Sequence, residues 1–119
     1  MGFTPMKPTT KAELEKTLRG VNELYASLEG TLDRSLTEPY IDANQYVKRY
    51  NHYRNELFSL LPDEDVADIL TEMSFYVYTG DDRTDVTNVK QLLVEVYLKT
   101  SQLMAYLQNQ LELGRGRTT

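Results

Sequence analysis

The chain has 119 residues, with no cysteine, no tryptophan and a single histidine. These counts exclude disulfides, thiol nucleophiles, iron–sulfur clusters, zinc–thiolate sites and any metal site that needs two histidines from one chain. The formal net charge of −5 disfavours wrapping of nucleic acid or binding to an anionic membrane. The length and the ordinary proportions of charged and hydrophobic residues, 26% and 40%, indicate one globular domain.

The start of the chain and its apolar runs bear on location. No apolar run approaches the roughly 20 residues that span a bilayer. Residues 1–10 contain no hydrophobic core of a signal peptide. We therefore expect a cytoplasmic protein that does not bind membranes.

A first helix is predicted over residues 10–34. Thr10 and Glu13 fit a capping box at its start. Gly20 lies inside this helix and either permits close approach of another helix or is a tolerated surface glycine. Residues 1–9 are expected to be flexible. The predicted core face has apolar residues at alternating spacings of four and three: Leu14, Leu18, Val21, Tyr25, Leu28 and Leu32.

A second helix is predicted over residues 42–61. Asp42 and Gln45 can cap its start, and Pro62 ends it. Its core face follows the same spacing with a marked share of tyrosine: Tyr46, Tyr50, Tyr53, Leu57 and Leu60.

A third helix is predicted over residues 63–78, beginning with the three acidic residues of 63–65 that suit a helix N-terminus. The last part, Phe75 to Tyr78, has the composition of a strand. Because no second segment offers a strand to pair with it, we extend the helix through it. Gly80 and Asp81 then break the chain.

A fourth helix is predicted over residues 85–112, capped by Thr84 or Asp85 and ended by Gly114, with a disordered tail over 114–119. Its apolar stripe is the most regular of all: Val86, Val89, Leu93, Val96, Thr100, Leu103 and Leu107. The four helices predict an all-α, elongated antiparallel four-helix bundle over residues 10–113. Since the third helix is short, we also expect a second copy of the chain to complete the core, which would make a homodimer.

Motifs for catalysis and cofactor binding are missing from the sequence. It contains no Glu-x-x-His, no His-Glu-x-x-His, no glycine-rich phosphate loop and no Gly-x-Ser-x-Gly. We expect no enzymatic activity, no cofactor and no metal.

Acidic residues concentrate in residues 62–85, where the local charge is −7. We expect them to make one end of the molecule negative, as a docking surface for a basic protein partner. Helix capping is the simpler interpretation, and a divalent metal bound by Asp81, Asp82 and Asp85 is a further alternative. The residues assigned to this acidic end are Asp63, Glu64, Asp65, Asp68, Asp81, Asp82 and Asp85.

Basic and tyrosine residues concentrate in residues 46–54. Arginine and tyrosine together can bind phosphates and stack on bases, so this stretch is an alternative face for nucleic acid, although the net charge disfavours it. Core tyrosines beside a solvated basic face are the simpler interpretation. The residues of this alternative face are Tyr46, Lys48, Arg49, Tyr50, His52, Tyr53 and Arg54.

The sequence thus favours a non-catalytic, regulatory or adaptor module that binds proteins and associates with itself. Its surplus of nine tyrosines also leans towards protein binding. The alternative is an accessory subunit that binds nucleic acid or belongs to a ribonucleoprotein.

Overall fold

The structure, a computed structural model, describes residues 7–34 and 41–116, with side chains through residue 113. It is all-α, and no strand occurs within these residues. The predicted helical bundle is confirmed. The helices are α1 (Pro8–Arg34), α2 (Ala43–Leu60), α3 (Glu64–Ile69) and α4 (Asp82–Gly116).

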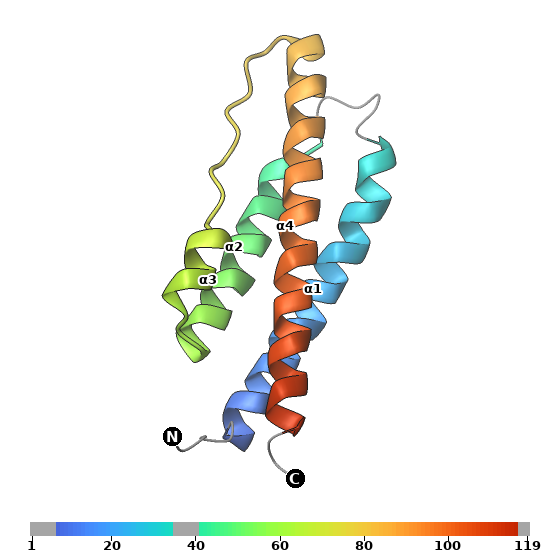
Figure 1. Ribbon diagram of the computed structural model, residues 1–119. Coiled ribbons are helices and arrows are strands. Elements are labelled where there is room, and N and C mark those ends of the chain that lie inside the picture. The colour runs from blue at the N-terminus through green and yellow to red at the C-terminus, as the bar shows by residue number, and fades with distance from the viewer. Residues whose placement is uncertain (1–6, 35–40, 117–119) are drawn as a thin grey trace.

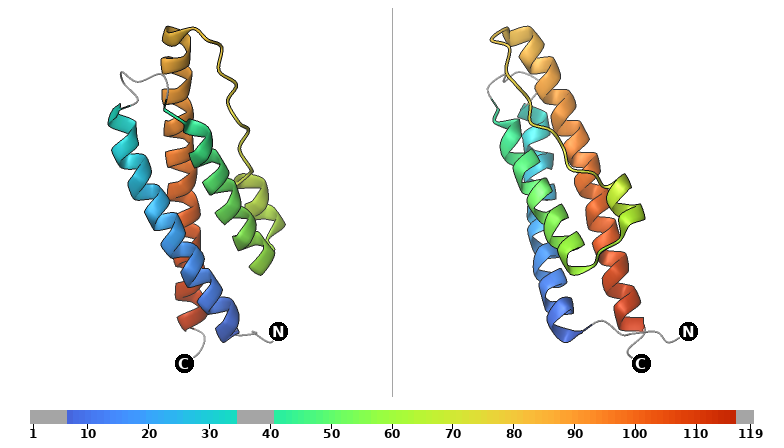
Figure 2. Two further views of the ribbon diagram at one scale, coloured as in Figure 1. Left: turned by 180° about the vertical axis from the view of Figure 1, so that it is seen from behind. Right: turned by 90° about the vertical axis from the view of Figure 1, so that its left-hand side faces the viewer.

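The three long helices α1, α2 and α4 pack against one another (Figure 1). Helix α1 runs in one direction along the bundle, and α2 and α4 both run in the other. The chain returns from the end of α2 to the start of α4 through the short α3 and an extended stretch, residues 70–81, which we call the crossover segment (Figure 2). The predicted alternation of direction is therefore kept, but its third leg is mostly extended chain.

The molecule is elongated, as predicted, with principal extents of 57 × 25 × 17 Å. Its radius of gyration is 16.6 Å. A compact globule of this length would have about 13–14 Å. The length of α1 and α4, rather than any appended part, sets this shape, because both helices run along the long axis (Figure 1).

Helix α1 begins at Pro8, two residues before the predicted start. Proline suits the first helical position, because it lacks an N–H that would have no partner there. Thr10 and Glu13 therefore lie inside the helix and not at its cap. The buried face is also rotated from the predicted one, and consists of Leu14, Thr17, Val21, Leu24, Leu28 and Thr31.

Two threonines explain this rotation. The hydroxyl of Thr17 donates to the main-chain carbonyl of Glu13 at 3.0 Å, and that of Thr31 to the carbonyl of Ser27 at 2.9 Å. Each threonine can be buried because its hydroxyl is satisfied by its own helix. The predicted alternatives at these turns are only partly buried and include Leu18 and Leu32.

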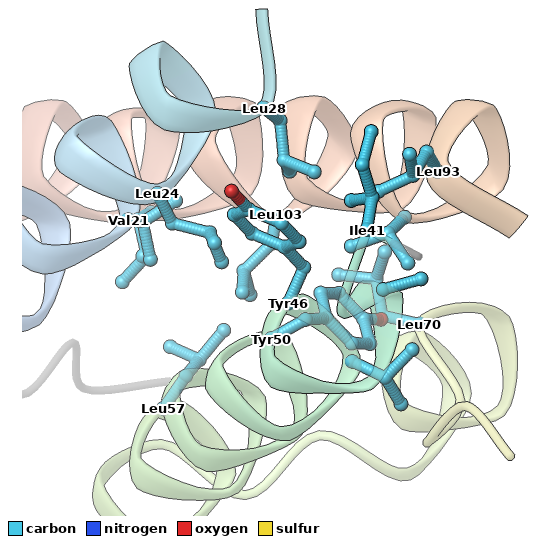
Figure 3. Packing of buried hydrophobic residues seen from close by; sticks show 14 of the residues in the cluster. Val21, Leu24, Leu28, Ile41, Tyr46, Tyr50, Leu57, Leu70, Leu93 and Leu103 are labelled. Carbon is cyan, nitrogen blue, oxygen red and sulfur yellow. The ribbon is translucent and has the colours of Figure 1, made fainter. Parts of the chain in front are cut away.

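Leucine and valine from all three long helices, with two tyrosines of α2, form the core (Figure 3). Tyr50 is fully buried and Tyr46 nearly so. Asp42 occupies the N-cap position of α2, but its side chain accepts no capping hydrogen bond from the described residues. The predicted stripe on α4 is confirmed from Val89 to Leu107, and Leu111 extends it.

Gly20 permits a close approach between α1 and α2. A Cβ atom at this position would lie 2.5 Å from the ring of Tyr53, far inside van der Waals contact. Of the two interpretations of Gly20 left open by the sequence, this contact therefore supports close helix approach. By contrast, a Cβ atom at Gly30 of the same helix would meet nothing within 4 Å.

The third helix is much shorter than predicted. It ends at Ile69, and the chain is extended where a helix was expected through residue 78. The strand-like composition of 75–78 was the correct signal, because aromatic and β-branched residues favour extended backbone. What pairs with this backbone is not another strand but side chains of α2, described below.

Both ends of α4 differ from the prediction. It starts at Asp82, because Asp81 and not Thr84 or Asp85 accepts the capping hydrogen bonds. It continues through Gly116, so Gly114 does not end it. One glycine lowers helix stability by about 1 kcal/mol, which does not stop a long helix whose preceding turns are formed. The flexible start and disordered tail were expected over residues 1–9 and 114–119; of these, residues 8–9 and 114–116 are helical, and residues 1–6 and 117–119 lie outside the described residues.

Candidate functional site

The alternative nucleic-acid face on α2 is divided between the core and the surface. The hydroxyl of Tyr46 lies 2.7 Å from that of Thr31, in the buried interface with α1. Tyr50 donates its hydroxyl to the carbonyl oxygen of Thr71 at 3.1 Å, and burial raises the pKa of Tyr50 to about 12. With the Tyr53 ring packed over Gly20, these three tyrosines serve the fold and do not present rings for stacking on bases.

The basic members of this face are likewise not gathered. Lys48 is exposed and Arg49 half-buried. The exposed His52 lies with its Nε2 atom 3.6 Å from a carboxylate oxygen of Glu56, one turn along the helix. Arg54 is turned towards the crossover segment, where its guanidinium is occupied by main-chain carbonyls.

The acidic residues fall into two groups that the crossover segment separates (Figure 2). Asp63 caps α3, accepting from the N–H of Val66 at 3.2 Å, and its other oxygen accepts from the hydroxyl of Tyr106. The other members of this group are exposed on α3: Glu64, Asp65 and Asp68. The single acidic end expected from the sequence is thus two patches, one beside α3 and one at the start of α4.

In the second group, Asp81 caps α4. One of its carboxylate oxygens accepts from both the main-chain N–H and the hydroxyl of Thr84, and these bonds lower the pKa of Asp81. Asp82 is exposed in the first turn of α4. Two of the residues assigned to partner docking are therefore helix caps, and their side chains are already committed to the fold.

Asp85 is buried, with 3% of its surface exposed, and fastens the end of the crossover segment. One carboxylate oxygen accepts from the hydroxyl of Tyr76 at 2.6 Å and from the N–H and hydroxyl of Thr79, both at 3.0 Å. The other accepts from the N–H of Gly80 at 3.1 Å. The Thr79 main-chain N–H above all, and then the Tyr76 hydroxyl, lower the pKa of Asp85.

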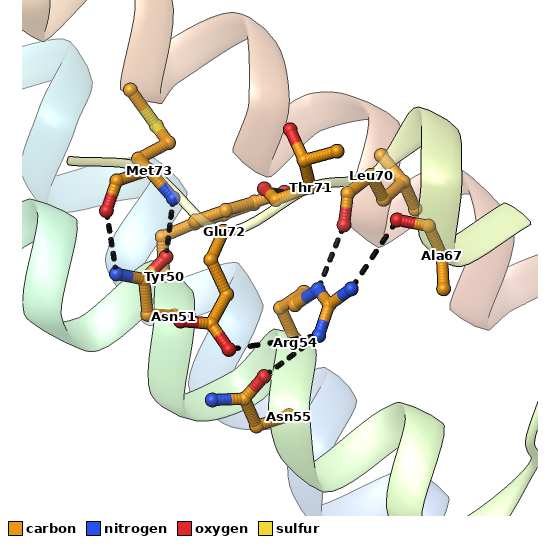
Figure 4. Close-up of polar contacts among 9 residues, drawn as sticks. All are labelled: Tyr50, Asn51, Arg54, Asn55, Ala67, Leu70, Thr71, Glu72 and Met73. Atoms are coloured by element: carbon orange, nitrogen blue, oxygen red, sulfur yellow. Dashed lines mark hydrogen bonds and ion pairs between the residues drawn. The ribbon is translucent and has the colours of Figure 1, made fainter.

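The middle of the crossover segment is held by two asparagines of α2 that the sequence analysis did not single out. The side-chain amide of Asn51 donates to the carbonyl of Met73 at 3.0 Å and accepts from its N–H at 2.8 Å (Figure 4). Asn44 does the same for Tyr76, at 2.9 and 2.8 Å. Each amide thus takes the place of a neighbouring strand, offering one donor and one acceptor to one residue.

The spacing of these contacts follows from simple geometry. Seven residues of helix separate Asn44 from Asn51, about 10.5 Å at 1.5 Å per residue. Three residues of extended chain separate Met73 from Tyr76, about 10 Å at 3.3 Å per residue. The two lengths agree, so both asparagines can contact the segment while it runs antiparallel to α2.

The start of the crossover segment is held by Arg54 (Figure 4). Its Nε donates to the carbonyl of Leu70 at 2.8 Å and its Nη2 to that of Ala67 at 3.2 Å. Its Nη1 lies 3.8 Å from a carboxylate oxygen of Glu72. We call the four residues of α2 that bind this part of the chain the α2 clamp: Asn44, Tyr50, Asn51 and Arg54.

The outward side of the crossover segment is apolar and exposed. Phe75 is 58% exposed and Val77 81%. Ile69, just before the segment, is 67% exposed. A fixed main chain, exposed apolar side chains and nearby carboxylates thus occur together at this segment.

The remaining features of the structure are weaker candidates for a functional site. A shallow pocket of about 350 Å³ is lined by Leu18, Gln108, Leu111 and Glu112, with one carboxylate among them. Within the described residues, no three acidic or histidine side chains are grouped closely enough to hold a metal ion. None of the described helices combines the length and apolar character needed to cross a membrane.

Comparisons with protein-family models, with curated proteins and with solved structures find no match to this chain.

Proposed function

We propose that this chain is a non-catalytic helical module of the cytoplasm that binds a basic protein partner through its crossover segment. One observation supports this above the others. Phe75 and Val77 are held on the surface by hydrogen bonds that the fold makes to neighbouring residues, among them the main chain of Met73 and Tyr76. Their exposed side chains contribute little to folding, and exposed apolar residues rimmed by polar ones mark protein-binding surfaces.

The charges around this segment favour a basic partner. Glu64, Asp65 and Asp68 are exposed on α3 beside the start of the segment, and Asp82 is exposed beyond its end. The nearby Lys99 donates to the carbonyl of Ile69 at 3.1 Å, so that cation is engaged with the main chain. A negative field on both sides of an apolar strip raises the rate at which a positively charged partner is captured.

A selection from a random-sequence peptide display library on the immobilised protein tests this proposal. We expect the enriched peptides to carry apolar residues flanked by lysine or arginine. Their binding should weaken as salt rises. The double variant Phe75→Ser with Val77→Ser removes the apolar strip but keeps every clamp contact, so it should fold normally and lose these peptides. Enrichment of acidic peptides, or equal retention by the variant, would refute the proposal.

We also propose that the chain associates with itself, through a different surface. The outer face of α4 carries two exposed apolar residues one turn apart, Val94 and Leu98. They lie in a row with no charge, at coiled-coil spacing: Thr87, Gln91, Val94, Leu98, Ser101 and Ala105.

Sizing with light scattering over a concentration series tests this second surface. A dimer that dissociates on Leu98→Glu substitution would support it. A protein that stays monomeric at all concentrations would remove self-association from the proposal.

A further inference from the structure

We infer that the partner binds by adding an extended strand to the crossover segment, along the side that faces away from α2. This inference rests on the proposed function and names its mode of recognition. In β-strand addition, main-chain hydrogen bonds provide affinity and alternate side chains provide specificity. The crossover segment offers both.

Around Tyr76, the main chain of the segment has one satisfied side and one free side. Tyr76 directs both its N–H and its C=O to Asn44. Adjacent residues of an extended chain direct these groups to opposite sides, so next to Tyr76 those of Phe75 and Val77 face away from α2. Met73, three residues before Tyr76, also faces α2, so the alternation is interrupted between these two residues. Within the described part of the chain, neither Phe75 nor Val77 makes a hydrogen bond. We call these two residues' N–H and C=O groups the outer edge.

The side chains alternate as they do in a strand with one buried face. Tyr76 and Tyr78 turn towards the helices, where their hydroxyls donate to Asp85 and to the carbonyl of Ile41, and their rings lie 5.1 Å apart. Phe75 and Val77 are the exposed residues between and beside them. The segment is a single strand whose inner neighbour is replaced by asparagine amides and whose outer neighbour is absent from the described residues.

The segment is also fixed before any partner arrives. Asn51 holds Met73 on one side of the outer edge, and Asp85 holds Thr79 and Gly80 on the other. Binding to a fixed strand avoids the entropy cost of ordering one of the two chains. An isolated extended segment without such contacts would not offer this advantage.

The charges on either side of the outer edge indicate what kind of chain binds there. The outer edge itself is uncharged, with Glu72 before it and Asp81 and Asp82 after it. A peptide with alternating apolar residues and a lysine or arginine at each end complements this pattern. A second copy paired antiparallel about Tyr76 would place Glu72 of one chain opposite Gly80 of the other, one residue from Asp81, so like charges would come close together at both ends of the pairing.

Amide hydrogen exchange, followed by NMR on the full chain, tests the inference. The probe is a synthetic peptide of alternating valine and threonine with lysines at both ends. We expect its binding to slow exchange at Phe75 and Val77 by about tenfold or more, with little change at Tyr76. N-methylation of one alternate set of peptide amides should abolish binding, while N-methylation of the other set should leave it.

A variant of the protein gives an independent readout. Val77→Pro removes one N–H of the outer edge and leaves the Asn44 contacts of Tyr76 in place. We expect it to weaken peptide binding about tenfold, the effect of one lost hydrogen bond. Val77→Ile, which keeps both the N–H and an apolar side chain, is the matched control and should bind as the parent does.

The outcomes separate this inference from the proposed function. Peptide binding that is insensitive to N-methylation and to Val77→Pro would overturn strand addition while leaving a basic partner in place. No binding of the basic probe peptide would overturn both. Exchange at Phe75 and Val77 that slows with rising protein concentration, without peptide, would show that a second copy is the occupant and overturn the hetero partner.

Discussion

Replacing Asn51 by alanine tests whether side-chain amides hold the crossover segment. The substitution removes both hydrogen bonds to Met73. At roughly 1 kcal/mol for each bond, the loss is about 2 kcal/mol. Alanine recovers roughly 0.6 kcal/mol because it favours the helix more than asparagine does. The expected net loss of unfolding free energy is therefore about 1.4 kcal/mol.

This loss converts into a measurable shift of the melting temperature. An unfolding entropy of about 2.1 cal/mol/K per residue gives a drop of roughly 6 °C for a chain of this length. Thermal denaturation followed by circular dichroism measures it, and hydrogen exchange at Met73 should accelerate in the same variant. Gln45→Ala is the matched control, because Gln45 is exposed on the same helix and should leave the melting temperature unchanged or slightly raised.

The opposite result would be informative. If Asn51→Ala melted at the same temperature as Gln45→Ala, the amide contacts would contribute nothing net. Water would then satisfy Met73 equally well, and the segment would not be fixed before binding. Strand addition would then have no preorganised segment to act on.

Three further outcomes are expected. Because the pKa of Asp85 is lowered in the folded state, its contribution to stability is complete above about pH 4 and lost as the pH falls; urea midpoints should drop below about pH 4, less steeply in Asp85→Asn. Gly20→Ala should lower the urea midpoint, since its Cβ would meet the Tyr53 ring at 2.5 Å, whereas Gly30→Ala should raise stability by about 1 kcal/mol; equal effects would contradict the packing argument. Thr100→Val should raise stability by about 1 kcal/mol, because the buried Thr100 hydroxyl has no hydrogen-bond partner among the described residues, and a loss measured by urea unfolding would show otherwise.

The long helices could be predicted from sequence because their apolar spacing repeats over many turns. On α1 the predicted face was rotated, since a pattern that counts threonine as polar overlooks Thr17 and Thr31, which satisfy their hydroxyls within the helix. The chain after Ile69 was predicted as helix although its composition favoured a strand. A strand needs a partner, and sequence patterns do not reveal that asparagine amides supply it.

Prediction of the site was less complete for a related reason. Charge and tyrosine clusters are visible in a sequence, but capping and burial decide their use. Asp63, Asp81 and Asp85 serve the fold, as do Tyr46 and Tyr50. Asn44 and Asn51 did leave a signal: two asparagines, poor helix formers, lie seven residues apart on one line of a predicted helix.

The α2 clamp binds mostly main-chain atoms. At residues 75 and 77, the requirements of folding are therefore separate from those of recognising a partner. Every amino acid except proline carries the N–H and C=O groups that such contacts use. The outward side chains at these two positions are therefore free to change without loss of folding. Substitutions there would alter which peptide is recognised while the bundle and its bound segment stay the same. The architecture is thus a scaffold on which new specificities can evolve, or be selected in the laboratory, at these two positions.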